Sequence, residues 1–367
     1  MDHYIILIIQ VVFVLNLILG LASLCTWFER KASALIQDRV GANRAGAFYR
    51  GDNFLSKSAS PFIRVLGKLG VINTLICDSV KGIMKEDFIP KGVNPILHAS
   101  GPFLAALPVF VSFAVIPFAP DFTIPAFTFF SYDFGPYDIK MQLAPLDAGA
   151  LFILAMGSIA VYGVAIAGFT GNNKFSFLGG LRAAAQMISY ELAMGIALAT
   201  AILVYGTTDI YAMVEAQKTV WGIIMMPIGF VILFITGLAE TKRGPFDMPE
   251  SESELVAGYF TEYSGMKFLL FWLGEFAEIA LFSAVISLLF FGGWNIPFVT
   301  LPEGTIFGAL LGHTILMTKI VFFCLLQIVI RWTIPRFRYD QLMNLGWKYL
   351  LPLSLVNLMG TAVVVLL

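Results

Sequence analysis

The sequence is poor in the residues from which metal and redox centres are built. It has only 3 cysteines and 3 histidines among 367 residues. Cys25, Cys77 and Cys324 lie far apart, each inside or beside an apolar run, and none belongs to a CxxC pair. This spacing excludes an iron–sulfur or zinc site built from the cysteines of this chain, and we predict no metal site. A glycine-rich nucleotide fingerprint after a strand is also absent, so in any redox reaction another protein must carry the electrons.

Charge is scarce as well. Only 13% of the residues are charged, 58% are hydrophobic, and the mean hydropathy is +0.84. Soluble domains contain about 25% charged and about 45–50% apolar residues, so this composition indicates a membrane protein that crosses the bilayer several times. The net charge of −1 argues against nucleic acid as a partner.

Long apolar runs occupy most of the chain. A helix needs about 20 mostly apolar residues to cross a bilayer, and eight segments meet this criterion. The first does not end in a small-residue cleavage site, so we predict that it is retained. The predicted fold class is all-α, a polytopic membrane protein with about eight transmembrane helices in a single membrane domain over residues 1–367. The predicted spans are 4–27, 97–120, 147–169, 188–206, 220–241, 266–291, 305–331 and 348–367.

A long polar loop, 28–96, separates the first two spans. Within it, apolar positions of Pro61–Glu86 recur at steps of three and four residues, which predicts an amphipathic helix along the membrane interface. All but three of the 23 lysines and arginines lie in this loop or in the three other loops on the same side of the layout. The positive-inside rule places these loops in the cytoplasm and both termini outside. Asp121–Pro145, rich in aromatic residues and proline, is then an outer-face cap or a subunit contact.

The stretch Gly237–Glu262 holds 6 of the chain's 24 acidic residues. It falls in the predicted cytoplasmic loop 238–266, between two spans. We interpret it as a proton-handling site, because packed carboxylates raise one another's pKa toward working pH; a solvated acidic loop is the alternative. Asp247 and Glu250 predict a capping box that starts a short helix, with Glu250 and Glu254 on one face. The acids are Glu240, Asp247, Glu250, Glu252, Glu254 and Glu262.

Three carboxylates fall inside predicted spans. Glu191 lies three residues into the fourth span, and Glu275 and Glu278 lie about ten residues into the sixth, on one helical face. Placing a carboxylate at the bilayer centre costs at least about 2.5–3.5 kcal/mol, so the three indicate a polar path through the bundle. Neutral acids that only hold helices together are the alternative. Lys319, in the seventh span, is a candidate counter-ion or further link in this path.

Arginines gather at the predicted cytoplasmic boundary. Arg30 and Arg39 follow the first span, Arg243 flanks the acids, and Arg331 ends the seventh span. One hypothesis is that they line a cavity for a polar headgroup on a lipophilic tail, beside aromatic residues such as Trp272. The other is that they anchor the topology and contact lipid headgroups.

Four stretches carry a family resemblance. They are ERKASALIQDRVGANRAG (29–46), NNKFSFLGGLRAAAQMISYE (172–191), LAETKRGPFDMPESESELVAGYFTEYSGMKF (238–268) and RFRYDQLMNLGWKYLLPL (336–353), together a quarter of the chain. With them the chain resembles the quinone-site membrane subunit, the H subunit, of the proton-pumping NADH:quinone oxidoreductases, the respiratory complex I family. The third motif is too long to be expected by chance.

This resemblance implies a subunit that is catalytic only within the assembly, where it joins the electron-transfer arm to antiporter-like membrane subunits. It is expected to form the access tunnel for quinone, the substrate, and to contact lipid. NADH, FMN and the iron–sulfur clusters are expected only in partner subunits, and the implied localisation is the cell inner membrane. The implied tunnel residues are Arg30, Arg39, Arg243, Trp272 and Arg331, and the implied proton-path carboxylates are Glu191, Glu240, Glu250, Glu252, Glu254, Glu262 and Glu275.

The chain departs from the family pattern at a few positions. Ala42 interrupts the usual Gly-Pro-Asn, and Asn73 and Thr74 replace the usual Gln-Pro; both changes concern the tunnel entrance. Glu278 is an additional acid where a polar amide is common, and Asp121–Pro145 is longer than usual. Two other functions stay open: the equivalent subunit of a membrane-bound hydrogenase-type complex, and a stand-alone ion antiporter.

Overall fold

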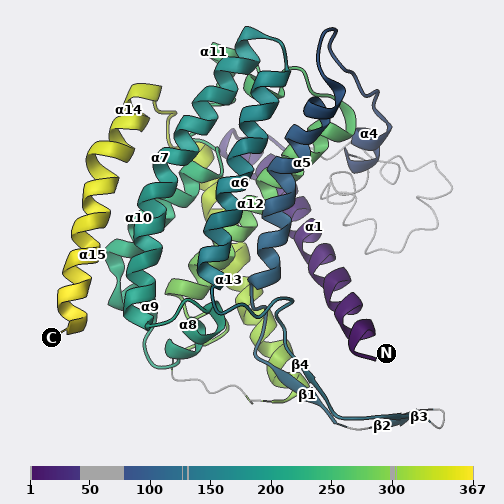
Figure 1. The fold of residues 1–367 in the computed structure, drawn as a ribbon, viewed down its shortest axis with the longest axis vertical. Coiled ribbons are helices and arrows are strands. Elements are labelled where there is room, and N and C mark those ends of the chain that lie inside the picture. The colour runs from purple at the N-terminus through teal and green to yellow at the C-terminus, as the bar shows by residue number, and fades with distance from the viewer. Residues whose placement is uncertain are drawn as a thin grey trace.

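The protein, described from a computed structural model, is a bundle of long helices that run roughly along one direction (Figure 1). Helix α12 (Gly265–Phe290) lies at its centre and is buried along 94% of its most apolar stretch. Helix α1 (Asp2–Ile36) and helix α15 (Leu351–Leu366) lie at opposite edges of the bundle (Figure 1). The structure describes residues 2–41, 78–125, 127–129, 132–297, 302 and 304–366.

Seven helices in these described ranges are long and apolar enough to cross a membrane. They confirm the prediction of a mostly helical, polytopic membrane protein. The last of them continues from α14 (Tyr339–Asn344) through a π-helical turn (Leu345–Leu350) into α15. The others are α1, α5 (Pro95–Ser112), α6 (Gly149–Thr170), α7 (Lys174–Tyr205), α12 and α13 (Ile306–Thr333).

The expected fifth span, 220–241, consists of two helices. Helix α9 (Gly222–Met225) ends before α10 (Pro227–Glu240), because Pro227 has no N–H with which to continue a helix. Helix α10 has 14 residues and is about 21 Å long. It is therefore not among the helices of the described ranges that are long enough to cross a membrane, and the expected eighth span stays a prediction. The two chain ends lie at the same end of the bundle (Figure 1).

Helix α7 begins much earlier than the expected start at residue 188. The side-chain oxygen of Asn173 accepts a hydrogen bond from the Phe175 N–H at 3.1 Å and caps the first turn. Glu191 therefore lies near the middle of a 32-residue helix rather than near its start. The error arose because Lys174 and Arg182 suggested a loop, whereas a long helix can extend beyond the bilayer.

Two pairs of short strands form a ribbon at the end of the bundle where the chain termini lie (Figure 1). Strand β1 (Phe122–Ile124) pairs antiparallel with β4 (Tyr137–Ile139), and β2 (Phe127–Phe129) pairs antiparallel with β3 (Tyr132–Phe134). The all-α prediction missed this ribbon. Its aromatic and β-branched residues are those that favour strands, so the composition of Asp121–Pro145 contained the signal.

Short elements connect the long helices. They include α4 (Asp78–Met84), a 3-10 turn (Phe113–Val115) and α8 (Ile210–Ala216), which Asp209 caps by accepting hydrogen bonds from two backbone N–H groups. Helix α4 falls at the end of the predicted amphipathic helix. The remainder of that prediction, residues 61–77, lies outside the described residues, as do Ala42, Asn73, Thr74 and Cys77.

The acidic stretch is mostly irregular rather than helical. Helix α11 (Glu252–Leu255) is a single turn that follows Ser251, and a 3-10 turn (Gly258–Phe260) comes next. The predicted capping box was wrong, because the Asp247 carboxylate forms an ion pair with Arg336 instead. Glu250 precedes the helix and does not share a helical face with Glu254.

Glycine at the crossing of α5 and α6 permits close backbone contact. A Cβ on Gly163 of α6 would lie 2.3 Å from the Ala105 backbone nitrogen, whereas a Cβ on Gly157 of the same helix would meet nothing within 4 Å. We expect Gly163→Ala to destabilise the folded protein by about 1–3 kcal/mol through overpacking, and Gly157→Ala to have little effect. Thermal unfolding of both variants in detergent tests this expectation; equal midpoints would contradict it.

Candidate functional site

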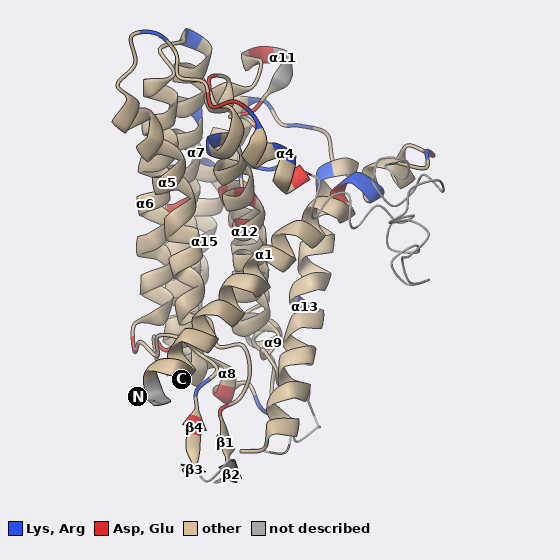
Figure 2. Cartoon of the chain, turned by 90° about the vertical axis from the view of Figure 1, so that its right-hand side faces the viewer, with Lys and Arg blue, Asp and Glu red and all other residues tan. Residues whose placement is uncertain are grey.

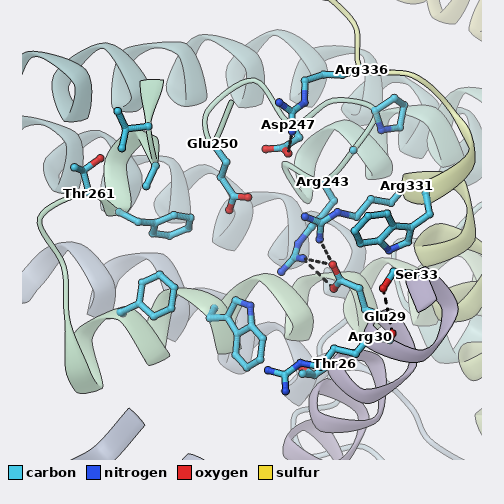
Figure 3. Close-up of a pocket in the computed structure, with 18 of the residues that line it drawn as sticks. Thr26, Glu29, Arg30, Ser33, Arg243, Asp247, Glu250, Thr261, Arg331 and Arg336 are labelled. Atoms are coloured by element: carbon cyan, nitrogen blue, oxygen red, sulfur yellow. Dashed lines mark hydrogen bonds and ion pairs between the residues drawn. The ribbon is translucent and has the colours of Figure 1, made fainter. Parts of the chain in front are cut away.

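A cavity of about 1050 Å³ lies between α1, α12, α13 and the acidic stretch. Helix α1 continues to Ile36, past its predicted end at residue 27, and carries Glu29 and Arg30 into the wall. Figure 3 shows Thr261 on one side of the cavity, Arg243, Arg331 and Glu29 on the other, and Glu250 between them. The lining residues are Thr26, Glu29, Arg30, Ser33, Lys85, Arg243, Gly244, Pro245, Asp247, Glu250, Val256, Ala257, Phe260, Thr261, Tyr263, Phe268, Trp272, Arg331, Trp332, Ile334 and Arg336.

Arg243 is the central cation of the cavity wall. Its guanidinium donates to Glu29 at 3.1 Å and to Glu275 at 3.0 Å, and it lies 4.3 Å from the centre of the Phe276 ring. Arg331 also contacts Glu29 (Figure 3). Arg243 is only 6% exposed, so these carboxylates supply the compensation that a buried cation needs.

Glu275 is held by two donors from different segments. In addition to Arg243, the Tyr259 hydroxyl donates to Glu275 Oε1 at 2.8 Å. Tyr259 comes from the 3-10 turn and Glu275 from α12, and Glu275 is 4% exposed. The contacts therefore connect the cavity wall to a carboxylate inside the bundle.

Two acids of the acidic stretch line the cavity itself. Burial raises the pKa of Glu250 well above its ordinary value, and the nearby Glu275 charge adds to this effect. Burial also raises the pKa of Asp247, although Arg336, 2.8 Å from its carboxylate, and Arg331 oppose the shift. Glu250 lies between Thr261 and Arg243 (Figure 3), so it can hold a proton where a ligand in the cavity would meet it.

A second group of charges lies deeper in the bundle. Lys242 forms an ion pair with Glu278 at 3.2 Å. Glu240 is 1% exposed, and neither of its carboxylate oxygens has a hydrogen-bond partner among the described residues. Glu240 and Glu278 line a second, small cavity of about 30 Å³ whose other walls are almost entirely apolar.

Three of the remaining predicted carboxylates, Glu191, Glu254 and Glu262, lie outside both cavities. Glu191 is half-buried and accepts a hydrogen bond from Ser158. Glu254 is exposed and pairs with Arg182, and Glu262 accepts from the Asn173 amide at 2.9 Å. The side chain of Glu252 is outside the described part of the structure.

Four of the five predicted tunnel residues line the large cavity: Arg30, Arg243, Trp272 and Arg331. Arg30 also pairs with Asp78 at 2.6 Å. Arg39 is exposed, donates to the Gln37 side chain at 2.7 Å, and is not among the lining residues. The structure thus brings most of the predicted basic set together.

Lys319 has a different role from the one suggested by its place in a span. Its ammonium group donates to the backbone carbonyls of Phe291, Gly293 and Asn295 at 2.7, 2.6 and 2.9 Å. Phe291 is the C-cap residue of α12, where carbonyls carry partial negative charge, and Gly293 and Asn295 belong to the turn that follows. Lys319 therefore stabilises the end of α12 and this turn. It contacts no carboxylate among the described residues.

Sequence reasoning missed several residues of the site. Glu29, Lys242 and Tyr259 each contact a predicted residue, yet none was assigned to the site. Lys242 could have been found, because a cation beside Arg243 in a packed segment needs its own carboxylate. Among the described residues, no group of three or more histidines, cysteines or acids could hold a metal ion.

Similarity to known proteins extends over nearly the whole chain. The family model described as NADH dehydrogenase matches residues 8–362. The chain is 40% identical over 366 residues to the H 1 subunit of the NADH-quinone oxidoreductase of Cytophaga hutchinsonii, covering 98% of this chain and 96% of that protein. It is 43% identical over 356 residues to NADH-quinone oxidoreductase subunit 8 of Rhodothermus marinus, covering 94% and 92%. It is 39% identical over 363 residues to the H subunit of the same enzyme of Flavobacterium johnsoniae, covering 98% and 94%.

Proposed function

The chain belongs to the family of NADH-quinone oxidoreductase H subunits of complex I, and from this we propose that its large cavity admits quinone and that its buried carboxylates couple quinone reduction to proton movement. As a complex I subunit it assembles with the other subunits of that enzyme. In this proposal the electrons reach the quinone from a partner subunit. This chain supplies the cavity and the proton-carrying groups.

The quinone assignment is supported by the size and the lining of the cavity. Pockets for small organic molecules have volumes of about 300–1,000 Å³ and mostly apolar walls with a few fixed polar groups. At about 1050 Å³, the cavity is large enough for a ring with part of an isoprenoid tail. Trp272, Phe268 and Phe260 offer apolar contact, while Arg243 and Arg331 offer donors to a ring oxygen.

The observation that carries the coupling proposal is the position of Arg243 between the cavity and Glu275. A negative charge that forms in the cavity attracts Arg243 and weakens its contact with Glu275. Glu275 then keeps the Tyr259 donor but loses part of its compensating charge, which favours uptake of a proton. Glu250, whose pKa burial raises well above its ordinary value, is the proton donor that we assign to this step.

From Glu275 we propose that protons pass inward to Glu240 and then to Glu191. Glu252, Glu254 and Glu262 belong to the same acidic stretch, and we propose that they connect this path to the outside or to a partner subunit. Arg39, which is exposed, belongs in this proposal to the rim of the tunnel rather than to the described cavity.

The proposed orientation of the chain rests on the distribution of its charges. Lysines and arginines gather at the end of the bundle that holds α4 and α11, and few lie at the opposite end (Figure 2). We propose that the end with the cavity faces the cytoplasm and contacts the electron-transfer arm, and that both termini are outside the cell inner membrane. The ribbon β1–β4 then lies at the outer face.

Filling the cavity tests the quinone proposal. Thr261 lines the side opposite Arg243 (Figure 3), and we expect Thr261→Trp in the assembled complex to raise the KM for quinone several-fold by occupying the space. Oxidation of NADH by a hydrophilic artificial acceptor, which takes electrons without entering the cavity, should not change. Thr261→Ser is the control with normal volume. An unchanged quinone KM in an assembled Thr261→Trp complex would contradict the proposal that quinone enters this cavity.

A hydrogenase-type subunit and a stand-alone antiporter were the other functions left open by the sequence. The relatives named above are subunits of NADH-quinone oxidoreductases, and the similarity covers nearly their full length. Neither alternative has an observation in its favour. Copurification of the chain with flavin and NADH oxidation activity, rather than hydrogen evolution, would distinguish the proposed function from the first of them.

A further inference from the structure

Lys242 and Glu278 form a buried ion pair that the proposed path does not use. Lys242 is 4% exposed and Glu278 is 5% exposed, and the Lys242 ammonium group lies 3.2 Å from Glu278 Oε2. The backbone of Lys242 has φ +54°, a left-handed conformation that residues other than glycine rarely adopt. Strain of this kind persists only where the surrounding contacts hold it. The chain therefore turns sharply after α10 and presents Lys242 to the interior.

Lys242 and Arg243, which are consecutive in the chain, form ion pairs with different carboxylates. Arg243 contacts Glu29 and Glu275 at the large cavity, whereas Lys242 contacts Glu278, three residues further along α12. Burial opposes the charge on Lys242, but the nearby carboxylates, Glu278 above all, outweigh it and raise the pKa of Lys242. Lys242 therefore keeps its charge. It lies near three acids, and its ion pair is with Glu278.

The small cavity connects Glu278 to Glu240. Both acids line this space of about 30 Å³, which exceeds the roughly 10–15 Å³ that a buried water requires. Most of the other walls are apolar, as at Leu233 and Leu281, and Ser112 contributes a hydroxyl group. Neither oxygen of Glu240 has a partner among the described residues, and a buried carboxylate without a partner is strongly unfavourable unless it carries a proton. Glu240 is thus in the protonated form in this arrangement, while Glu278 is ionised against Lys242.

We propose that Glu278 is a proton-transfer carboxylate between Glu275 and Glu240, and that Lys242 is the cation that allows one of the pair Glu278 and Glu240 to be ionised at a time. This inference rests on the proposed function of the carboxylate path. In an inward transfer, Glu240 first releases its proton toward Glu191, and Glu278 takes up a proton from Glu275. The O–H bond of Glu278 then breaks and an O–H bond forms on the Glu240 carboxylate, through water in the small cavity. No electrons move. The negative charge returns from Glu240 to Glu278, and Lys242 remains close to both.

The test uses the assembled complex in sealed vesicles, with proton pumping measured per amount of flavin. Glu278→Gln is expected to reduce pumping at least about fivefold, which corresponds to about 1 kcal/mol. The double variant Lys242→Met with Glu278→Gln removes the pair without leaving a buried unpaired charge. We expect pumping by the double variant to stay low as well. Recovery of wild-type pumping in the double variant would show that the Lys242–Glu278 ion pair has only a structural role.

Two further variants separate the possible failures. Glu278→Asp keeps a carboxylate beside Lys242 and is expected to retain at least half of the pumping. A loss as complete as in Glu278→Gln would overturn the role of Glu278, and this result does not depend on assembly of the double variant.

Glu240→Gln tests the carboxylate path itself. If Glu240→Gln lowers pumping while the double variant does not, the path stands and only the inference about Glu278 fails. If Glu240→Gln pumps normally, the proposed path fails first.

Discussion

An assembled complex that carries Arg243→Met is expected to have NADH:quinone activity at least about tenfold below that of the wild type, and a much lower stability. Arg243 is 6% exposed and compensates two buried carboxylates, Glu29 and Glu275. Removing one partner of a buried ion pair costs about 3–5 kcal/mol, because the remaining charge has neither solvent nor counter-ion. The amount of complex in membranes, its thermal unfolding midpoint and its quinone activity measure the effect.

Two variants show whether this effect depends on burial and geometry. Arg338→Met removes an ion pair with Asp340 in which the two side chains are 78% and 59% exposed, so we expect a loss of at most about 1 kcal/mol. Arg243→Lys keeps the charge, yet a single ammonium group cannot reproduce the planar contacts to Glu29 and Glu275, and intermediate activity is expected. Equal losses in Arg243→Met and Arg338→Met would contradict the central position assigned to Arg243.

The crossings of this chain could be predicted because the bilayer imposes a length and a composition on them. Every predicted span overlaps a helix of the structure, and the break between α9 and α10 had a visible signal in Pro227. The start of α7 was missed because its polar first half extends beyond the apolar segment. Hydropathy identifies the part of a helix that lies in the bilayer, and the caps outside it depend on local hydrogen bonds such as that of Asn173.

The site could be predicted as a set of residue types, but its pairings could not. Buried charge in an apolar chain is costly, so Glu275, Glu278 and Arg243 stand out in the sequence. Which acid meets which base depends on the packing of distant segments: Glu29 and Arg243 are 214 residues apart. Asp247 illustrates the difficulty, since its short-range pattern predicted a helix cap and its actual partner is Arg336 on a later segment.

The second large effect is expected from Glu275→Gln, which should reduce proton pumping and quinone-dependent NADH oxidation by about tenfold or more, or about 1.4 kcal/mol in activation free energy. Glutamine has nearly the same shape as glutamate and can still accept the hydrogen bond from Tyr259. Arg243 keeps Glu29 as a charged partner, so the complex should assemble. What the variant loses is a carboxylate that can take up and release a proton.

Normal assembly with low pumping would therefore place the defect in proton transfer rather than in folding. Asp340→Asn is the matched control, because it also replaces a carboxylate by an amide. The Asp340 side chain is 59% exposed, and in the described part of the structure its ion pair is with Arg338. Glu275→Asp should recover part of the activity, since it restores the ionisable group at a greater distance from Tyr259 and Arg243. Wild-type pumping by a fully assembled Glu275→Gln complex would show that protons do not need this carboxylate. In that case Arg243 would bind Glu275 only to neutralise it, and the coupling between the cavity and the interior would have to run through Lys242 and Glu278.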